Sequence, residues 1–93
     1  MRYLICCQIN SLSNYEKISN TVKIISNGNW CEYLHCVWLV KTNYKTANEL
    51  YDRFKPFIDI NDKLLIVEIK NNKQGMLKAT EWNYINTAIF KDD

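Results

Sequence analysis

The sequence predicts a single domain of the α+β class, with an antiparallel sheet that carries its helices on one face. The chain has 93 residues, a length that supports one hydrophobic core. Apolar residues make up 47% of the chain, and it holds only 2 glycines and 1 proline, so we expect regular elements joined by short turns. Strand-type and helix-type spacings of apolar residues alternate along the chain.

The first expected element is a strand between Arg2 and Asn10. Its alternating residues are largely apolar on both faces, a pattern typical of a strand that is covered on both sides. We therefore expect a central strand, or one with helices on one face and a partner subunit on the other.

A helix is expected next, because Ser13 to Glu16 have the residue types of a capping box. The Ser13 hydroxyl can accept the amide of Glu16, whose side chain reaches back, so the helix should begin at Asn14. Gly28 should end it, because glycine readily adopts the left-handed conformation that closes a helix.

The segment from Trp30 to Thr42 has the longest strand pattern, rich in aromatic and β-branched residues. We expect one long strand here. A bend or bulge is expected near Glu32 to His35, where the alternation is least regular.

A second capping-box pattern, Thr46 to Glu49, places the start of a second helix close to Ala47. Pro56 lacks an amide hydrogen and should stop this helix at about Lys55. The expected buried face of the helix consists of Ala47, Leu50, Tyr51, Phe54 and Phe57.

The rest of the chain predicts a third strand and a variable C-terminal segment. Lys63 to Lys70 form a nearly continuous apolar run, typical of a covered strand. Within residues 71–93, a helix is expected from Thr80 to Phe90, with Thr80 as its N-cap. A short strand from Met76 to Ala79 would also fit.

This order of elements matches a ferredoxin-like sandwich of the βαββαβ type, in which both helices pack on one side of an antiparallel sheet. The opposite face of the sheet stays uncovered in that plan. Apolar residues on it predict burial by the C-terminal segment or by a second copy of the chain.

Charge and cysteine content narrow the function only slightly. The 12 basic and 10 acidic residues leave a net charge of +2, too little to indicate a nucleic-acid partner by itself. The cysteines lack Cys-x-x-Cys spacing and His35 is the single histidine, so we expect reduced thiols, no metal site and a cytoplasmic location. The four cysteines are Cys6, Cys7, Cys31 and Cys36. No apolar run approaches the roughly 20 residues that span a bilayer.

Several segments resemble the Cas2-like proteins, also described as the SinR family. These segments are Met1 to Ile5, Trp30 to Tyr33, Val37 to Thr42, Ala47 to Pro56 and Asp62 to Ile69. The resemblance implies a ferredoxin-like fold and homodimers that form through the sheets. Members of the family act as structural subunits of the CRISPR integrase, some are reported as metal-dependent nucleases, and the VapD toxins of similar fold are ribonucleases.

The family commonly has an aspartate at the end of the first strand, where two subunits bring a pair together to hold a divalent metal. The corresponding residue here is Gln8. A neutral amide cannot supply the anionic oxygen that a hard cation needs, so the resemblance implies a scaffold that lacks this metal. Gln8 and Asn10 are therefore only weak catalytic candidates.

Other candidate site residues come from their chemistry. His35 can exchange protons near neutral pH, although a structural role in a strand is the alternative we favour. Tyr3, Tyr33 and Trp38 could stack on bases, although core or dimer packing is preferred. Polar and basic residues near the ends of elements could bind nucleic acid or another ligand; they are Arg2, Asn10, Lys41, Lys45 and Arg53, with Lys70 a further phosphate contact.

Two functions follow. The preferred one is a non-catalytic, homodimeric Cas2-like module that binds a nucleic acid, a nucleotide or a protein, with no cofactor and no membrane. The residue usage is typical of an AT-rich genome, which suits a phage or mobile-element product acting on host antiviral defence. The alternative is a small metal-dependent endoribonuclease or deoxyribonuclease of the Cas2 or VapD type, with Mg²⁺ and with catalytic groups at His35, Asp59 or Asp62.

Overall fold

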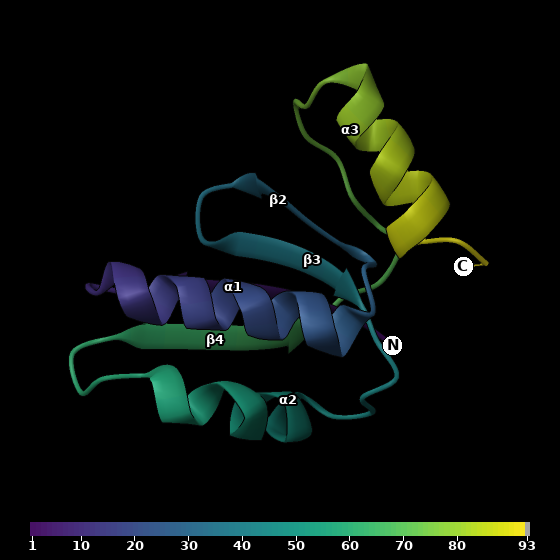
Figure 1. Cartoon of the computed structure of the whole chain (residues 1–93). Coiled ribbons are helices and arrows are strands. Elements are labelled where there is room, and N and C mark those ends of the chain that lie inside the picture. Colours follow the sequence, from purple (N-terminus) through teal and green to yellow (C-terminus); the bar gives the residue numbers. More distant parts are fainter. Residues whose placement is uncertain (93) are drawn as a thin grey trace.

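The computed structural model describes residues 1–92 (Figure 1). Strands and helices follow in the order β1 (Arg2–Gln8), α1 (Leu12–Ser26), β2 (Trp30–Leu34), β3 (Val37–Lys41), α2 (Ala47–Phe54), β4 (Lys63–Glu68) and α3 (Ala79–Tyr84). A 3₁₀ turn, Lys55–Phe57, extends α2, and a π-helical turn, Ile85–Ile89, extends α3.

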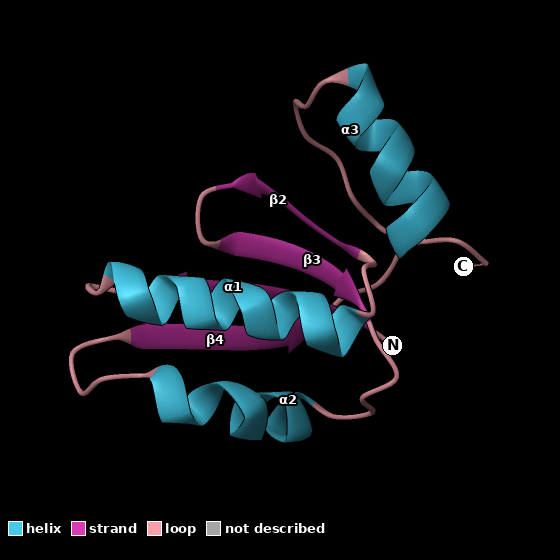
Figure 2. Ribbon diagram, in the orientation of Figure 1, coloured by secondary structure: helices cyan, strands magenta, loops and turns pink. Residues whose placement is uncertain are grey.

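The strands form one antiparallel sheet in the order β2-β3-β1-β4. β1 is central, as expected, with Ile5 opposite Trp38 of β3 on one side and opposite Ile66 of β4 on the other. Helices α1 and α2 lie together over one face of this sheet (Figure 2). The predicted α+β class, with a ferredoxin-like arrangement of strands and helices, is therefore confirmed.

The prediction of one long strand from Trp30 to Thr42 is wrong. The chain reverses at His35 and Cys36, so the segment forms the hairpin of β2 and β3. Cys36 adopts the left-handed conformation, with φ of 62°, and Glu32 accepts its amide hydrogen at 2.7 Å. Glycine or asparagine usually marks such a turn, so a cysteine in this position gives no turn signal. The irregularity expected near Glu32 to His35 does occur, as a register shift between Cys31 and Leu34.

The start of α1 also differs from the prediction. The helix begins at Leu12, and its N-cap is Ser11 rather than Ser13, because the Ser11 hydroxyl accepts the amide of Asn14 at 3.2 Å. β1 ends at Gln8, so Ser11 is already in place to cap the helix two residues before Ser13.

The remaining helix ends follow the predicted signals closely. Asn27 and Gly28 close α1 in left-handed conformations, with φ of 49° and 88°. Thr46 caps α2 by accepting the amide of Glu49 at 3.1 Å, and Pro56 lies in the 3₁₀ turn just after the helix.

The C-terminal helix exists, but it begins one residue before the predicted Thr80. Lys78 is its N-cap residue, and its amide donates to Glu81 Oε1 at 2.9 Å. The segment from Met76 to Lys78 is not in a strand. Figure 1 shows α3 on the β2 side of the sheet, away from α2.

The sheet separates two hydrophobic clusters. The larger one fills the space between the sheet and the helices α1 and α2, and it includes Tyr3 and Trp38, which are fully buried and so not available for stacking on bases. The smaller one lies on the other face, where Ile85, Ile89 and Phe90 cover Cys31. Tyr51 was expected in the buried face of α2 but is exposed, since Leu50 and Phe54 alone point fully into the core.

Candidate functional site

The end of β1, where the resemblance places a metal-binding aspartate, has the wrong charge for a cation. Gln8 is exposed and pairs in register with Lys63 of β4. Both residues line a shallow hollow of about 220 Å³, together with Cys6, Cys7, Leu64 and Leu65. A neutral amide beside a lysine offers no anionic ligand, so this hollow is a poor place for Mg²⁺.

Asn10, Asp59 and Asp62 lie near the same end of the sheet and hold two loops together. The amide of Asn10 donates to Asp62 Oδ1 at 3.2 Å, and the amide of Asp59 donates to Asp62 Oδ2 at 2.9 Å. Asn14 Nδ2 donates to Asp59 Oδ2 at 3.0 Å. These carboxylates therefore have structural contacts that close the loop before β4 and join it to the start of α1.

The predicted basic contacts lie toward the opposite end of the sheet. Arg2 donates to the carbonyls of Ile89 and Lys91, both at 2.7 Å, and its guanidinium lies over the ring of Phe90. Lys41 is opposite Arg2 in the register and donates to the Lys91 carbonyl at 3.4 Å. Arg2 and Lys41 thus hold the C-terminal segment against the sheet.

The other predicted basic residues are more accessible. Lys45 and Lys70 are exposed. Arg53 is exposed, donates to the Tyr44 hydroxyl and lies over its ring. Lys73, which sequence reasoning did not single out, lies over the Phe90 ring at 4.5 Å, so it joins Arg2 and Lys41 in a cationic group around Phe90.

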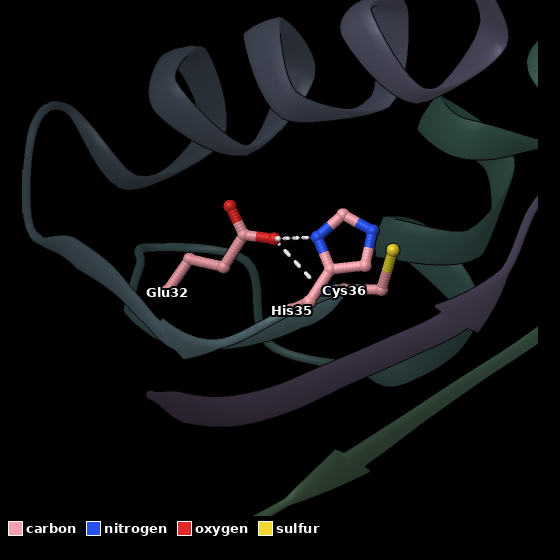
Figure 3. Close-up of side chains that lie close together, drawn as sticks. All are labelled: Glu32, His35 and Cys36. Carbon is pink, nitrogen blue, oxygen red and sulfur yellow. Dashed lines mark hydrogen bonds and ion pairs between the residues drawn. The ribbon is translucent and has the colours of Figure 1, made fainter. Parts of the chain in front are cut away.

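The third predicted catalytic candidate, His35, belongs to a polar cluster in the turn between β2 and β3 (Figure 3). Its imidazole is 82% exposed, and Nδ1 lies 3.8 Å from Glu32 Oε2. The thiol of Cys36 lies beside them, and the possible metal-ligating atoms of Glu32, His35 and Cys36 are all within 4.8 Å of one another.

The packed side of this cluster comes from α1 and β1. The Tyr15 hydroxyl donates to both carboxylate oxygens of Glu32, at 2.7 and 2.9 Å, and its ring stacks on His35 with centroids 5.3 Å apart. The Cys7 amide donates to the Cys36 carbonyl at 3.1 Å, and this bond joins the turn to β1.

Burial keeps the two thiols of this cluster neutral. Desolvation raises the pKa of Cys7 to about 12, with the neighbouring Cys36 as a further cause. Desolvation also raises the pKa of Cys36, although the hydrogen bond from Cys7 opposes the shift. Neither thiol is therefore an activated nucleophile in this environment.

Sequence reasoning selected His35 but did not combine it with Glu32 and Cys36 in one site. The signal was present as Glu-x-x-His-Cys, since the two ends of a tight turn bring residues three or four apart into contact. That spacing is uninformative in an extended strand, which is how the segment was interpreted.

A second notable surface is the exposed half of the sheet face opposite α1 and α2. We call it the open patch; it consists of Leu34, Leu65 and Val67, with Leu4 and Val37 half-buried beside them. Leu34 and Leu65 are 63% and 58% exposed. A cavity of about 340 Å³ adjoins the patch where the C-terminal segment crosses the face, lined by Leu4, Tyr33, Leu39, Met76, Leu77 and Trp82 among others.

Among residues 1–92, none of the helices combines the length and the apolar character needed to cross a bilayer. Searches with family models, among curated proteins and among solved structures find no match to this chain. The resemblance to the Cas2-like proteins therefore stays a hypothesis that depends on the segments quoted above.

Proposed function

We propose that this protein is a non-catalytic binding module that works as a homodimer, in which two copies pack through the open patch. The exposure of Leu34, Leu65 and Val67 on one sheet face is the observation that carries the proposal. A contiguous apolar surface of this kind typically marks an interaction site. The homodimers implied by the Cas2-like resemblance form through the same element, the sheet.

A second copy of the chain is the occupant that fits the patch best. The side chains at its centre are apolar, so they match an identical surface across a two-fold axis without any need for charge pairing. The same lack of charge argues against a nucleic-acid backbone on this face, because phosphates require cationic contacts.

The association test compares two apolar-to-charged substitutions. Leu65→Lys places a charge in the open patch, whereas Ile24→Lys changes a residue on α1 that is 67% exposed and lies on the other side of the molecule. In light scattering after size exclusion, we expect a dimer for the original chain and for Ile24→Lys, and a monomer for Leu65→Lys. A monomeric original chain at micromolar concentration would refute the dimer.

A second function is favoured by the cations around Phe90. Arg2, Lys41 and Lys73 gather at one end of the sheet, and Lys45 lies exposed in the loop that follows β3. We propose that this end contacts the phosphates of a nucleic acid, and two copies of the chain would double the number of contacts.

Binding is tested with a double substitution and its matched control. We expect Lys45→Ala with Lys73→Ala to weaken binding of labelled RNA or DNA and to reduce its salt dependence. Lys17→Ala with Lys55→Ala removes the same charge from exposed positions on α1 and just after α2 and should leave affinity nearly unchanged. Equal losses in both would mean that the net charge, rather than this end of the sheet, determines binding.

The nuclease alternative is tested in the same samples. The protein is incubated with the labelled RNA and DNA in Mg²⁺, in Mn²⁺ and with a chelator. Binding without cleavage would exclude the nuclease, whereas metal-dependent cleavage that is lost in Gln8→Ala would refute the non-catalytic module. The proposed role in host defence is a separate hypothesis, checked by expressing the gene in bacteria challenged with phage.

A further inference from the structure

We propose that the turn between β2 and β3 is a binding site for a borderline-soft divalent cation such as Zn²⁺, with Glu32, His35 and Cys36 as its protein ligands. This site is distinct from the hollow at Gln8, where the Cas2-like resemblance would place Mg²⁺. It is also independent of the open patch, and it departs from the expectation, based on cysteine spacing, that the chain has no metal site.

The first argument is the separation of the ligand atoms. Those of Glu32, His35 and Cys36 lie within 4.8 Å of one another. Ligands in a tetrahedral zinc site are about 3.3–3.8 Å apart, because the Zn–N and Zn–S bonds are about 2.0–2.3 Å long. Glu32 Oε2 and His35 Nδ1 already lie 3.8 Å apart, and the imidazole is exposed enough to rotate towards the third ligand.

The second argument is the donor set. A thiolate, an imidazole and a carboxylate are the ligand types that zinc prefers, whereas Mg²⁺ prefers oxygen ligands only. These three protein ligands leave the fourth position of a tetrahedral Zn²⁺ to a water molecule, on the exposed side of the turn where His35 lies. The ligands then come from β2 and from the turn itself, so the bound cation would hold the turn closed.

The third argument is that the ligands already have supporting hydrogen bonds. Metal-binding carboxylates and imidazoles are commonly oriented by a further set of contacts. Here Tyr15 and the amide of Cys36 donate to Glu32, at 2.7 to 2.9 Å, and the Tyr15 ring stacks on His35. The hydrogen bond from the Cys7 amide to the Cys36 carbonyl holds the turn at a constant distance from β1.

Binding requires the loss of a thiol proton. The metal ligand is the thiolate, so the Cys36 thiol releases its proton to the buffer as the metal–sulfur bond forms.

The test is a titration of the reduced, chelator-treated full chain with Zn²⁺ by calorimetry and with Co²⁺ by absorption. We expect one cation per chain, proton release on binding, and a thiolate-to-cobalt charge-transfer band that reports sulfur ligation. His35→Gln should weaken Zn²⁺ binding at least tenfold, because it removes a ligand at an exposed position with little risk to the fold.

Cysteine variants separate this site from nonspecific thiol binding. Cys36→Ser should abolish the charge-transfer band because it removes the sulfur ligand, while Cys6→Ser is the matched control, since Cys6 faces the opposite side of the sheet. The proposal is overturned if the original chain takes up no Zn²⁺ at micromolar concentration. Equal uptake by the original chain and by His35→Gln combined with Cys36→Ser would overturn it as well.

Discussion

The two faces of the sheet differ in how completely they are covered. On the face of α1 and α2, side chains such as Ile5, Trp38 and Phe54 have no exposed surface. On the other face, the C-terminal segment covers the β2 side, and the open patch remains exposed. The comparison teaches that the helix-covered face holds the main core of the monomer, whereas the other face is packed only in part and has apolar surface left for association.

The largest expected effect is a substitution on the helix-covered face. Phe54→Ala should lower the free energy of unfolding by about 3–5 kcal/mol, because it leaves a cavity in the main core. Tyr51→Ala on the same helix changes an exposed side chain and should cost much less. Urea denaturation followed by circular dichroism measures both, and equal losses would show that α2 is not packed as described.

The next effect concerns the C-terminal cover of the other face. Ile89 is fully buried beside Cys31, Ile85 and Phe90, so Ile89→Ala should lower the free energy of unfolding by about 2–4 kcal/mol. Amide hydrogen exchange should become faster in α3 before it does so in α1. Uniform acceleration throughout the chain would mean that the two faces unfold as one unit.

A smaller effect distinguishes the two serines near the start of α1. Ser11→Ala should lower the free energy of unfolding by about 1 kcal/mol, because it removes the hydroxyl that accepts the Asn14 amide. Ser13→Ala changes an exposed residue inside the first turn and should be nearly neutral. If Ser13→Ala lowered the melting temperature more than Ser11→Ala does, Ser13 would be the N-cap, as the capping-box pattern predicted.

The last effect is a pH dependence that arises at Cys7, below α1, and is seen only in alkaline solution. The ordinary pKa of the thiol, 9.0, is raised to about 12 in the folded chain, mainly by desolvation. Between these values the unfolded chain loses the proton and the folded chain keeps it, so this contribution to stability is complete below pH 9 and is lost as pH rises towards 12. Denaturation midpoints of the original chain should therefore fall more steeply than those of Cys7→Ala above pH 9, and parallel curves would contradict the shift.

The parts of the fold that could be predicted depend on contacts between near neighbours in sequence. Thr46 caps α2 through a residue three positions on, and Asn27 and Gly28 end α1 through their own backbone conformation. The alternation in β1 correctly indicated a central strand. The choice of Ser11 over Ser13 could not be made, because both serines have the same capping chemistry and only the end of β1 separates them.

The candidate sites depended on contacts between side chains that form only in the folded chain. His35 and Gln8 were selected from their chemistry alone. Glu32 and Cys36 were not recognised as site residues, because the turn depends on a left-handed backbone conformation at Cys36 that its residue type does not indicate. Arg2 was expected to contact a ligand, whereas its described hydrogen bonds are to carbonyls near the C-terminus. Residue type indicates what a side chain is able to bind, but it does not indicate which groups of the folded chain the side chain already contacts.

By itself the sequence determined the α+β class, the central first strand and most helix ends, since these follow from apolar periodicity and from hydrogen bonds within one turn of helix. Only the tertiary structure decided where the chain reverses between β2 and β3, and which half of the sheet face opposite α1 and α2 is covered by α3. It also decided that Tyr15 contacts Glu32 and that Cys7 contacts Cys36 in that turn. Such contacts join residues far apart in the chain, and they form only when the helices and strands pack together.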